Sequence, residues 1–175
     1  GESLQSFEYS LKFFGFETRS GENIGAEYRR IGEGIRTPFR ISDSLQIESG
    51  EYWWNEFRLS ASSFESRTLS ASVFVSAGQF FEGTNNRLKL SSSWRVNKNL
   101  RLGAIYDVNN IKMSQGDLVT NLFSSRADFA FNANTFGSLL GQWSSAADQF
   151  IFNFRLRWIP VIGTDFYLIV NQIYD

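Results

Sequence analysis

Apolar and polar residues alternate without interruption between residues 150 and 158. Successive side chains of a β-strand point to opposite faces, so this alternation predicts a strand with one apolar and one mostly polar face. The apolar positions are Phe150, Phe152, Phe154, Leu156 and Trp158, and the opposite positions are Ile151, Asn153, Arg155 and Arg157. Pro160 and Gly163 interrupt the pattern before a second apolar-rich segment at 166–173. Together the segments predict a long hairpin whose aromatic face requires an apolar environment.

Similar alternation recurs along the chain and predicts about ten strands. We place them at residues 4–16, 22–31, 51–62, 67–80, 87–96, 100–110, 119–131, 136–144, 150–158 and 166–173. Most are roughly 10–13 residues long, whereas strands of soluble proteins have a mode of about 5–6 residues and tilted membrane strands need about 9–11. Strand length therefore favours a membrane barrel more strongly than alternation does.

In two segments the alternation of apolar and polar residues is less regular. In residues 4–16 the alternation places Phe13 beside Leu11 and puts Phe14 on the opposite face. Residues 136–144 are rich in glycine and less regular, and there we expect Leu139 and Trp143 on the apolar face with Gln142 opposite.

The predicted connections fall into a compact set and a longer set. Turns at 18–21, 63–66, 97–99 and 132–134 are compact, whereas 32–50, 81–86 and 112–118 are longer, with a short strand expected near residues 39–41. Bacterial barrels have short periplasmic turns and longer outer loops. With the turn at 160–165 on the periplasmic side, the last strand runs outward. We therefore expect that the chain lacks at least one closing strand, since lipid does not tolerate an open sheet edge.

Composition excludes several classes of function. The net charge is −1, which gives no electrostatic basis for binding nucleic acid. The chain has no cysteine and no histidine, so it has no disulfide framework, no thiolate metal site and no histidine base. Aromatic residues make up 17% of the chain, and no apolar run approaches the ~20 residues of a membrane helix.

Two fold interpretations account for the aromatic stripes. In a soluble β-sandwich they would face inward and form the core. In a membrane barrel they would face lipid, with polar residues lining a wet interior and the aromatic residues near the two interfaces. The interface residues would then be Trp53, Trp94, Trp143, Trp158 and Tyr106.

Charged side chains opposite the stripes are candidates to line the lumen of such a barrel. The candidates are Arg58, Arg87, Lys89, Arg95, Arg101, Asp107, Arg126, Asp128, Arg155 and Arg157. The eight basic residues would make a cationic interior that passes or holds anions. The alternative is that they pair with Glu56, Asp107 and Asp128 and conduct nothing, as paired interior charges often do in narrow barrels.

Catalysis is not expected. A Ser-His-Asp triad is impossible without histidine. Asp107 and Asp128 form a conceivable carboxylate pair on neighbouring strands, with nothing beyond adjacency to single them out. The glycines at 32–34 and 83 lack the strand-to-helix context of a phosphate loop. We expect no enzyme activity, no metal site and no cofactor.

Short motifs resemble a known family from Pro38 onward. They are residues 38–39, 50–52, 66–67, 78–83, 115–117, Arg155-Leu156-Arg157-Trp158-Ile159-Pro160 and, most specifically, Gly163-Thr164-Asp165-Phe166-Tyr167-Leu168-Ile169-Val170-Asn171-Gln172. They are similar to the outer-membrane β-barrel domain of unknown function that follows a carbohydrate-binding family 9-like domain. The resemblance implies a further closing strand, a glycan-binding domain upstream of this chain, and no established catalytic residues.

We therefore expect an all-β, antiparallel up-and-down transmembrane β-barrel of the bacterial outer membrane, formed as one domain by residues 1–175. It would span and anchor, with a pore or the display of an upstream glycan-binding domain as further roles. The expected partners are the lipid bilayer, a further strand or second chain that completes the barrel, and a glycan held through the upstream domain. The alternative is a soluble all-β binding module.

Overall fold

A computed structural model describes residues 6–161 and 163–175, and every regular element in those ranges is a β-strand. The strands are β1 (Ser6–Glu17), β2 (Asn23–Ile35), β3 (Phe39–Arg40), β4 (Gln46–Ile47), β5 (Gly50–Ser62), β6 (Leu69–Phe80), β7 (Gly83–Asn97), β8 (Leu100–Met113), β9 (Gly116–Asn132), β10 (Thr135–Ser144), β11 (Gln149–Val161) and β12 (Thr164–Tyr174). Over these residues, no helix is long and apolar enough to cross a membrane.

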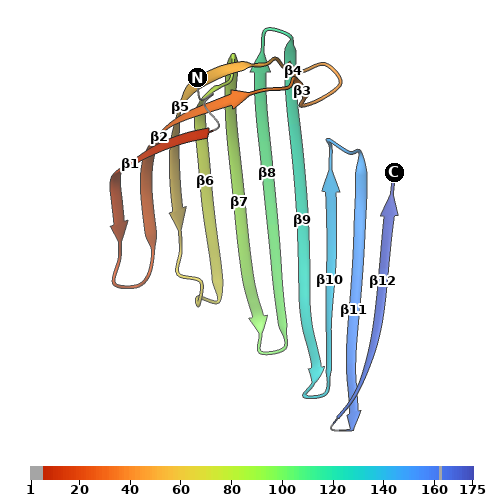
Figure 1. Ribbon diagram of the computed structural model, residues 1–175. Coiled ribbons are helices and arrows are strands. Elements are labelled where there is room, and N and C mark those ends of the chain that lie inside the picture. The colour runs from red at the N-terminus through yellow and green to blue at the C-terminus, as the bar shows by residue number, and fades with distance from the viewer. Residues whose placement is uncertain (1–5, 162) are drawn as a thin grey trace. The chain divides into compact units, whose positions relative to one another are not determined.

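Ten strands form one antiparallel sheet in chain order, β1-β2-β5-β6-β7-β8-β9-β10-β11-β12, and β3 pairs only with β4 (Figure 1). The predicted all-β, antiparallel up-and-down class and its ten strands are confirmed. Neighbours in sequence are neighbours in space because short turns favour pairing between consecutive strands. Residues 4 and 5 of the first predicted strand and residue 162 of the last predicted turn lie outside the described residues.

Two compact units divide the chain. The first consists of Gly1–Ser62, Val73–Lys89 and Val108–Thr120, and the second of Ser63–Ser72, Leu90–Asp107 and Asn121–Asp175. Strands β6 to β9 contribute residues to both units, whereas β1 to β5 belong to the first and β10 to β12 to the second.

Two of the three long loops predicted from the sequence are tight turns. The connection between β6 and β7 is only 81–82, and that between β8 and β9 is only 114–115. The prediction was wrong because Phe81 adopts a positive φ of 49° and Gly116 a φ of 152°, so the chain reverses within two residues. The polar residues that follow then pair in the sheet. Residues 36–49 are the one long connection among these, so loop length no longer distinguishes two rims clearly.

Cross-strand register separates an apolar from a polar face in the first unit. Register partners lie on the same side of an antiparallel sheet. The rungs Leu11–Tyr28–Phe57 and Phe16–Ile24–Ala61 lie on one side, which we call the first unit's apolar face. The alternate rungs Ser10–Arg29–Glu56 and Lys12–Glu27–Arg58 lie on its polar face. The alternation of apolar and polar residues along β2 and β5 therefore agrees with the register.

A β-bulge in β1 corrects the predicted position of Phe14. The register shifts between Lys12 and Phe14, so Phe14 pairs with Ala26 on the apolar face. A bulge inserts one residue and resets the alternation, which simple periodicity cannot anticipate. Phe13 and Phe14 are both more than half exposed, so two consecutive aromatic rings remain uncovered.

The second unit has the same two-sided character. Its apolar face carries the rungs Phe123–Trp143–Phe150–Tyr174 and Ala127–Leu139–Phe154–Val170. Its polar face carries Arg126–Leu140–Asn153–Asn171 and Asp128–Ser138–Arg155–Ile169. The alternation predicted for residues 150–158 is confirmed, as are the assignments of Leu139, Trp143 and Gln142.

The buried residues are few and lie mainly where the long connection folds back. We call residues 36–49, which include β3 and β4, the strap. Leu45 and Ile47 of the strap are 1% and 3% exposed, and Trp54 and Ile111 are 6% and 5% exposed. The short strand predicted near residues 39–41 is present as β3, whereas its partner β4 and the burial of the strap were not predicted.

Candidate functional site

The polar face of the first unit carries a connected set of charges. Arg29 on β2 forms ion pairs with Glu8 on β1 and with Glu56 on β5, the latter at 3.3 Å. The Nε of Arg58 donates to the same Glu56 carboxylate at 2.9 Å, and its guanidinium lies 5.8 Å from the centre of the Phe74 ring. The ladder register brings these residues together because they occupy adjacent strands on one face.

The polar face of the second unit holds two local ion pairs. The Nε of Arg126 donates to both oxygens of Asp128 at 2.9 Å, two residues along the same strand. Arg157 donates to Asp165 across the β11–β12 turn at 3.1–3.2 Å. Asp128, one member of the conceivable carboxylate pair, is thus engaged by an arginine on its own strand.

The remaining candidates divide by strand. Arg87, Lys89 and Arg95 are separated by even numbers of residues and so share one side of β7, and Arg101 and Asp107 share one side of β8 in the same way. Four of the candidates have no carboxylate within ion-pair distance among residues 6–161 and 163–175. They are Lys89, Arg95, Arg101 and Arg155. The polar faces therefore combine satisfied pairs with unneutralised cations.

An aromatic cluster fixes the strap against the first unit. The ring of Phe81 lies 4.8 Å from that of Trp54, 5.1 Å from Tyr52 and 6.1 Å from Phe39 of the strap. Tyr52 and Trp54 alternate with the apolar residues of β5, so this cluster joins the strap to the polar side of that strand.

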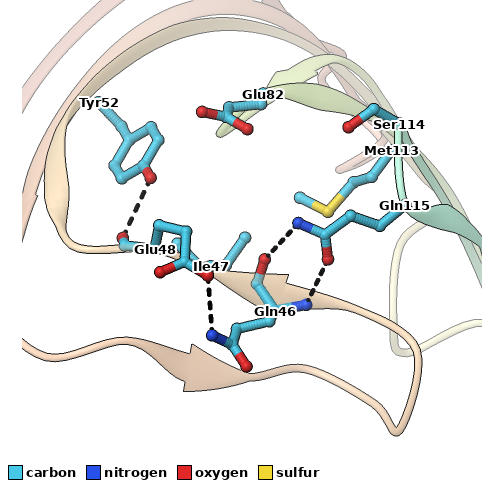
Figure 2. Close-up of a pocket in the computed structure, with 8 residues that line it drawn as sticks. All are labelled: Gln46, Ile47, Glu48, Tyr52, Glu82, Met113, Ser114 and Gln115. Atoms are coloured by element: carbon cyan, nitrogen blue, oxygen red, sulfur yellow. Dashed lines mark hydrogen bonds between the residues drawn. The ribbon is translucent and has the colours of Figure 1, made fainter.

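A reciprocal pair of amide hydrogen bonds joins the strap to the β8–β9 turn. Figure 2 shows Gln46 and Gln115 facing each other: the Gln46 backbone N–H donates to Gln115 Oε1 at 2.8 Å, and Gln115 Nε2 donates to the Gln46 carbonyl at 2.9 Å. The Tyr52 hydroxyl donates to the Glu48 carbonyl at 3.0 Å. These bonds hold the strap at its β4 end.

The pocket in Figure 2 is too small for a substrate. Its volume is about 10 Å³, which corresponds to a single water molecule. Glu48, Glu82, Tyr52, Met113 and Gln115 line it together with three further residues, Gln46, Ile47 and Ser114. Among the residues that the structure describes, no cluster of three potential metal ligands occurs. The strap is thus a packed closure of this region.

Sequence reasoning missed several participants. Glu8 and Arg29 were not among the lumen candidates, although their strands alternate, because the register that aligns them with Glu56 is not visible in any single strand. Asp165 was assigned to a turn. Gln46 of the strap and Gln115 of the β8–β9 turn lie 69 positions apart, a separation that no local pattern reports.

No family model matches the chain, and no curated protein matches it. Two solved structures resemble it, and both are porins. They are the KdgM porin and the KdgM porin in complex with disordered oligogalacturonate, each with a TM-score of 0.41 and 11% sequence identity. The similarity covers 96% of this chain and 89–90% of the porin chains.

Proposed function

We propose that this chain forms the membrane-spanning part of a bacterial outer-membrane β-barrel. The observation that supports this most directly is the exposure of the aromatic face. Phe16 and Phe57 are each 56% exposed, and Trp158 is 50% exposed, although all three lie on apolar faces. A soluble sandwich would bury such rows, at a gain of about 25 cal/mol per Å². In the bilayer the same rows meet acyl chains.

Strand dimensions support the proposal. The apolar row of β11 extends from Phe150 to Trp158, eight residue steps or about 26 Å along the strand. The apolar band of an outer-membrane barrel is about 25 Å tall. The proposed interface residues Trp53, Trp94, Trp143, Trp158 and Tyr106 are all exposed, whereas Trp54 is buried.

We propose in addition that another strand, from elsewhere in the protein or from a second chain, completes the barrel. β12 stands at one end of the strand order, and ten of its eleven residues are exposed. An unpaired backbone edge costs several kcal/mol per polar group in hydrocarbon. The family resemblance of residues 163–172 supports this part of the proposal, together with the display of an upstream glycan-binding domain at the surface.

A pore is the second role that we propose, and the unneutralised cations of the polar faces favour it. Lys89, Arg95, Arg101 and Arg155 would give an interior that attracts anions. The strap would narrow the interior near the ends of β2 and β5. If the charged residues of the interior pair only with one another, the barrel serves as an anchor and does not conduct.

Extraction and migration test the proposal. The protein should require detergent and should migrate faster on an unheated gel than on a heated one, as folded barrels do. Recovery in buffer as a monomer without detergent would support the soluble binding module instead. Planar-bilayer recording then separates pore from anchor, since an ohmic, anion-biased current is expected only from an open interior.

A further inference from the structure

A polar band crosses the apolar face of the first unit at one level. The register places Tyr9, Arg30 and Asn55 on a single rung of β1, β2 and β5. Between this rung and the β1–β2 turn, three rungs of the same face are apolar apart from one phenol. They are Leu11–Tyr28–Phe57, Phe14–Ala26–Leu59 and Phe16–Ile24–Ala61. If this face meets lipid, the band lies at the level where hydrocarbon gives way to headgroups.

Arg30 stands out among the charged residues of this face. Its guanidinium lies 5.6 Å from the centre of the Trp53 ring, and its side chain is exposed. Within the described part of the chain it forms no ion pair with a carboxylate. A planar, always-charged guanidinium without a counter-ion is suited to a phosphate group, which it can bind with two parallel hydrogen bonds.

Amide and hydroxyl groups continue the band beyond Arg30. The Tyr28 hydroxyl donates to Asn55 Oδ1 at 2.6 Å, and Asn55 Nδ2 donates to Gln79 Oε1 at 3.4 Å. An open depression of about 440 Å³ adjoins this chain of bonds, lined by Asn55, Phe57, Gly78, Gln79, Thr84 and Asn86. Amides and a hydroxyl beside an aromatic ring are the groups that bind sugar hydroxyls.

We propose that this band is a binding site for the phosphorylated sugar headgroup of a membrane lipid. Arg30 binds the phosphate, and the amides of the depression bind the sugar. The inference rests on the proposed function, because it requires the apolar face to contact lipid. Charge complementarity selects an anionic headgroup, since Arg30 is unneutralised.

The test uses the full chain in detergent with added lipid A, whose headgroup is a phosphorylated disaccharide, followed by native mass spectrometry. We expect one bound lipid A per chain, binding about tenfold weaker in Arg30→Gln, and little retention of dephosphorylated lipid A. Arg19→Gln, which removes an exposed positive charge from the β1–β2 turn, should bind as the unmodified protein does. Asn86→Ala should weaken binding without changing net charge.

Three outcomes would overturn the site: equal binding in Arg30→Gln, equal binding of the dephosphorylated lipid, or displacement of lipid A by inorganic phosphate at equal concentration. The last would identify a simple phosphate site. Heat-modifiable migration is recorded for every variant, so that a misfolded variant is recognised. If Arg30→Gln misfolds, lipid A binding by Asn86→Ala tests the site instead. If lipid A does not bind but the migration is heat-modifiable, the lipid site is wrong and the proposed barrel still stands. A chain that stays in buffer without detergent contradicts the proposed function itself.

Discussion

At the scale of single residues, glycine determines how closely neighbouring strands approach in this protein. A Cβ added to Gly78 would lie 2.3 Å from the Asn55 carbonyl oxygen, and one added to Gly83 would lie 2.1 Å from the Lys112 carbonyl oxygen. Backbone atoms cannot move aside as a flexible side chain can. A Cβ at Gly103 would meet only the Ser92 carbonyl oxygen at an ordinary 3.6 Å.

Replacement of Gly78 tests this close approach. Gly78→Ala should lower the free energy of unfolding by about 1–3 kcal/mol, because the strand must shift away from β5. Gly103→Ala is the matched control and should change it by less than about 0.5 kcal/mol. Urea unfolding of both variants in lipid vesicles provides the comparison, and equal midpoints would show that the strands have room at Gly78.

At the scale of elements, the strap is a connection that has its own buried contacts. Leu45 is 1% exposed, and a Cβ on Gly116 would lie 3.8 Å from it, an ordinary contact distance. Phe81 contributes four ring contacts to the surrounding cluster from a backbone with positive φ. Such a conformation persists only where the surrounding packing compensates for its cost.

Loss of the Gln115 side chain should loosen the strap. Gln115→Ala removes both hydrogen bonds to Gln46, worth about 1–2 kcal/mol together, so trypsin should cleave after Arg40 about tenfold faster. Gln149→Ala, which removes a glutamine bond to Asp175 at 2.7 Å, is the control and should leave cleavage at Arg40 unchanged. Identical cleavage rates in the two variants would mean that the amide pair does not hold the strap.

At the scale of the whole molecule, the two faces should respond oppositely to charge. Phe154 and Asn153 are adjacent on β11 but face opposite sides of the sheet. Phe154→Arg should destabilise the protein in vesicles by about 2–4 kcal/mol if its face meets the bilayer, whereas Asn153→Arg should be tolerated. Urea midpoints in vesicles measure both, and comparable losses would argue against a lipid-facing Phe154.

Ion selectivity tests whether Arg155 lines an open pore. Arg155 has no carboxylate partner within the described ranges, so Arg155→Gln should lower the anion-to-cation permeability ratio by about twofold. Arg19→Gln, in a turn, should leave the ratio unchanged. The reversal potential under a salt gradient gives the ratio, and an unchanged value in Arg155→Gln would remove this arginine from the conduction path.

Much of the fold follows from the sequence alone, because the period of two is a local property. A strand such as 150–158 specifies its two faces without reference to any partner, since the backbone itself alternates side chains. Strand number, the order of elements and most face assignments were therefore predictable. The small number of buried residues also agrees with a sequence in which apolar residues occupy every second position of the strands.

Register, the bulge and the strap depended on the tertiary structure. The slip at Phe14 is a property of the β1–β2 pair, and the convergence of Glu8, Arg29 and Glu56 requires three strands to be aligned. The tight turn at 81–82 is stable because Phe81 packs against rings from β5 and the strap. Local patterns determine which face a residue occupies, but only contacts between residues distant in sequence decide which residues meet there.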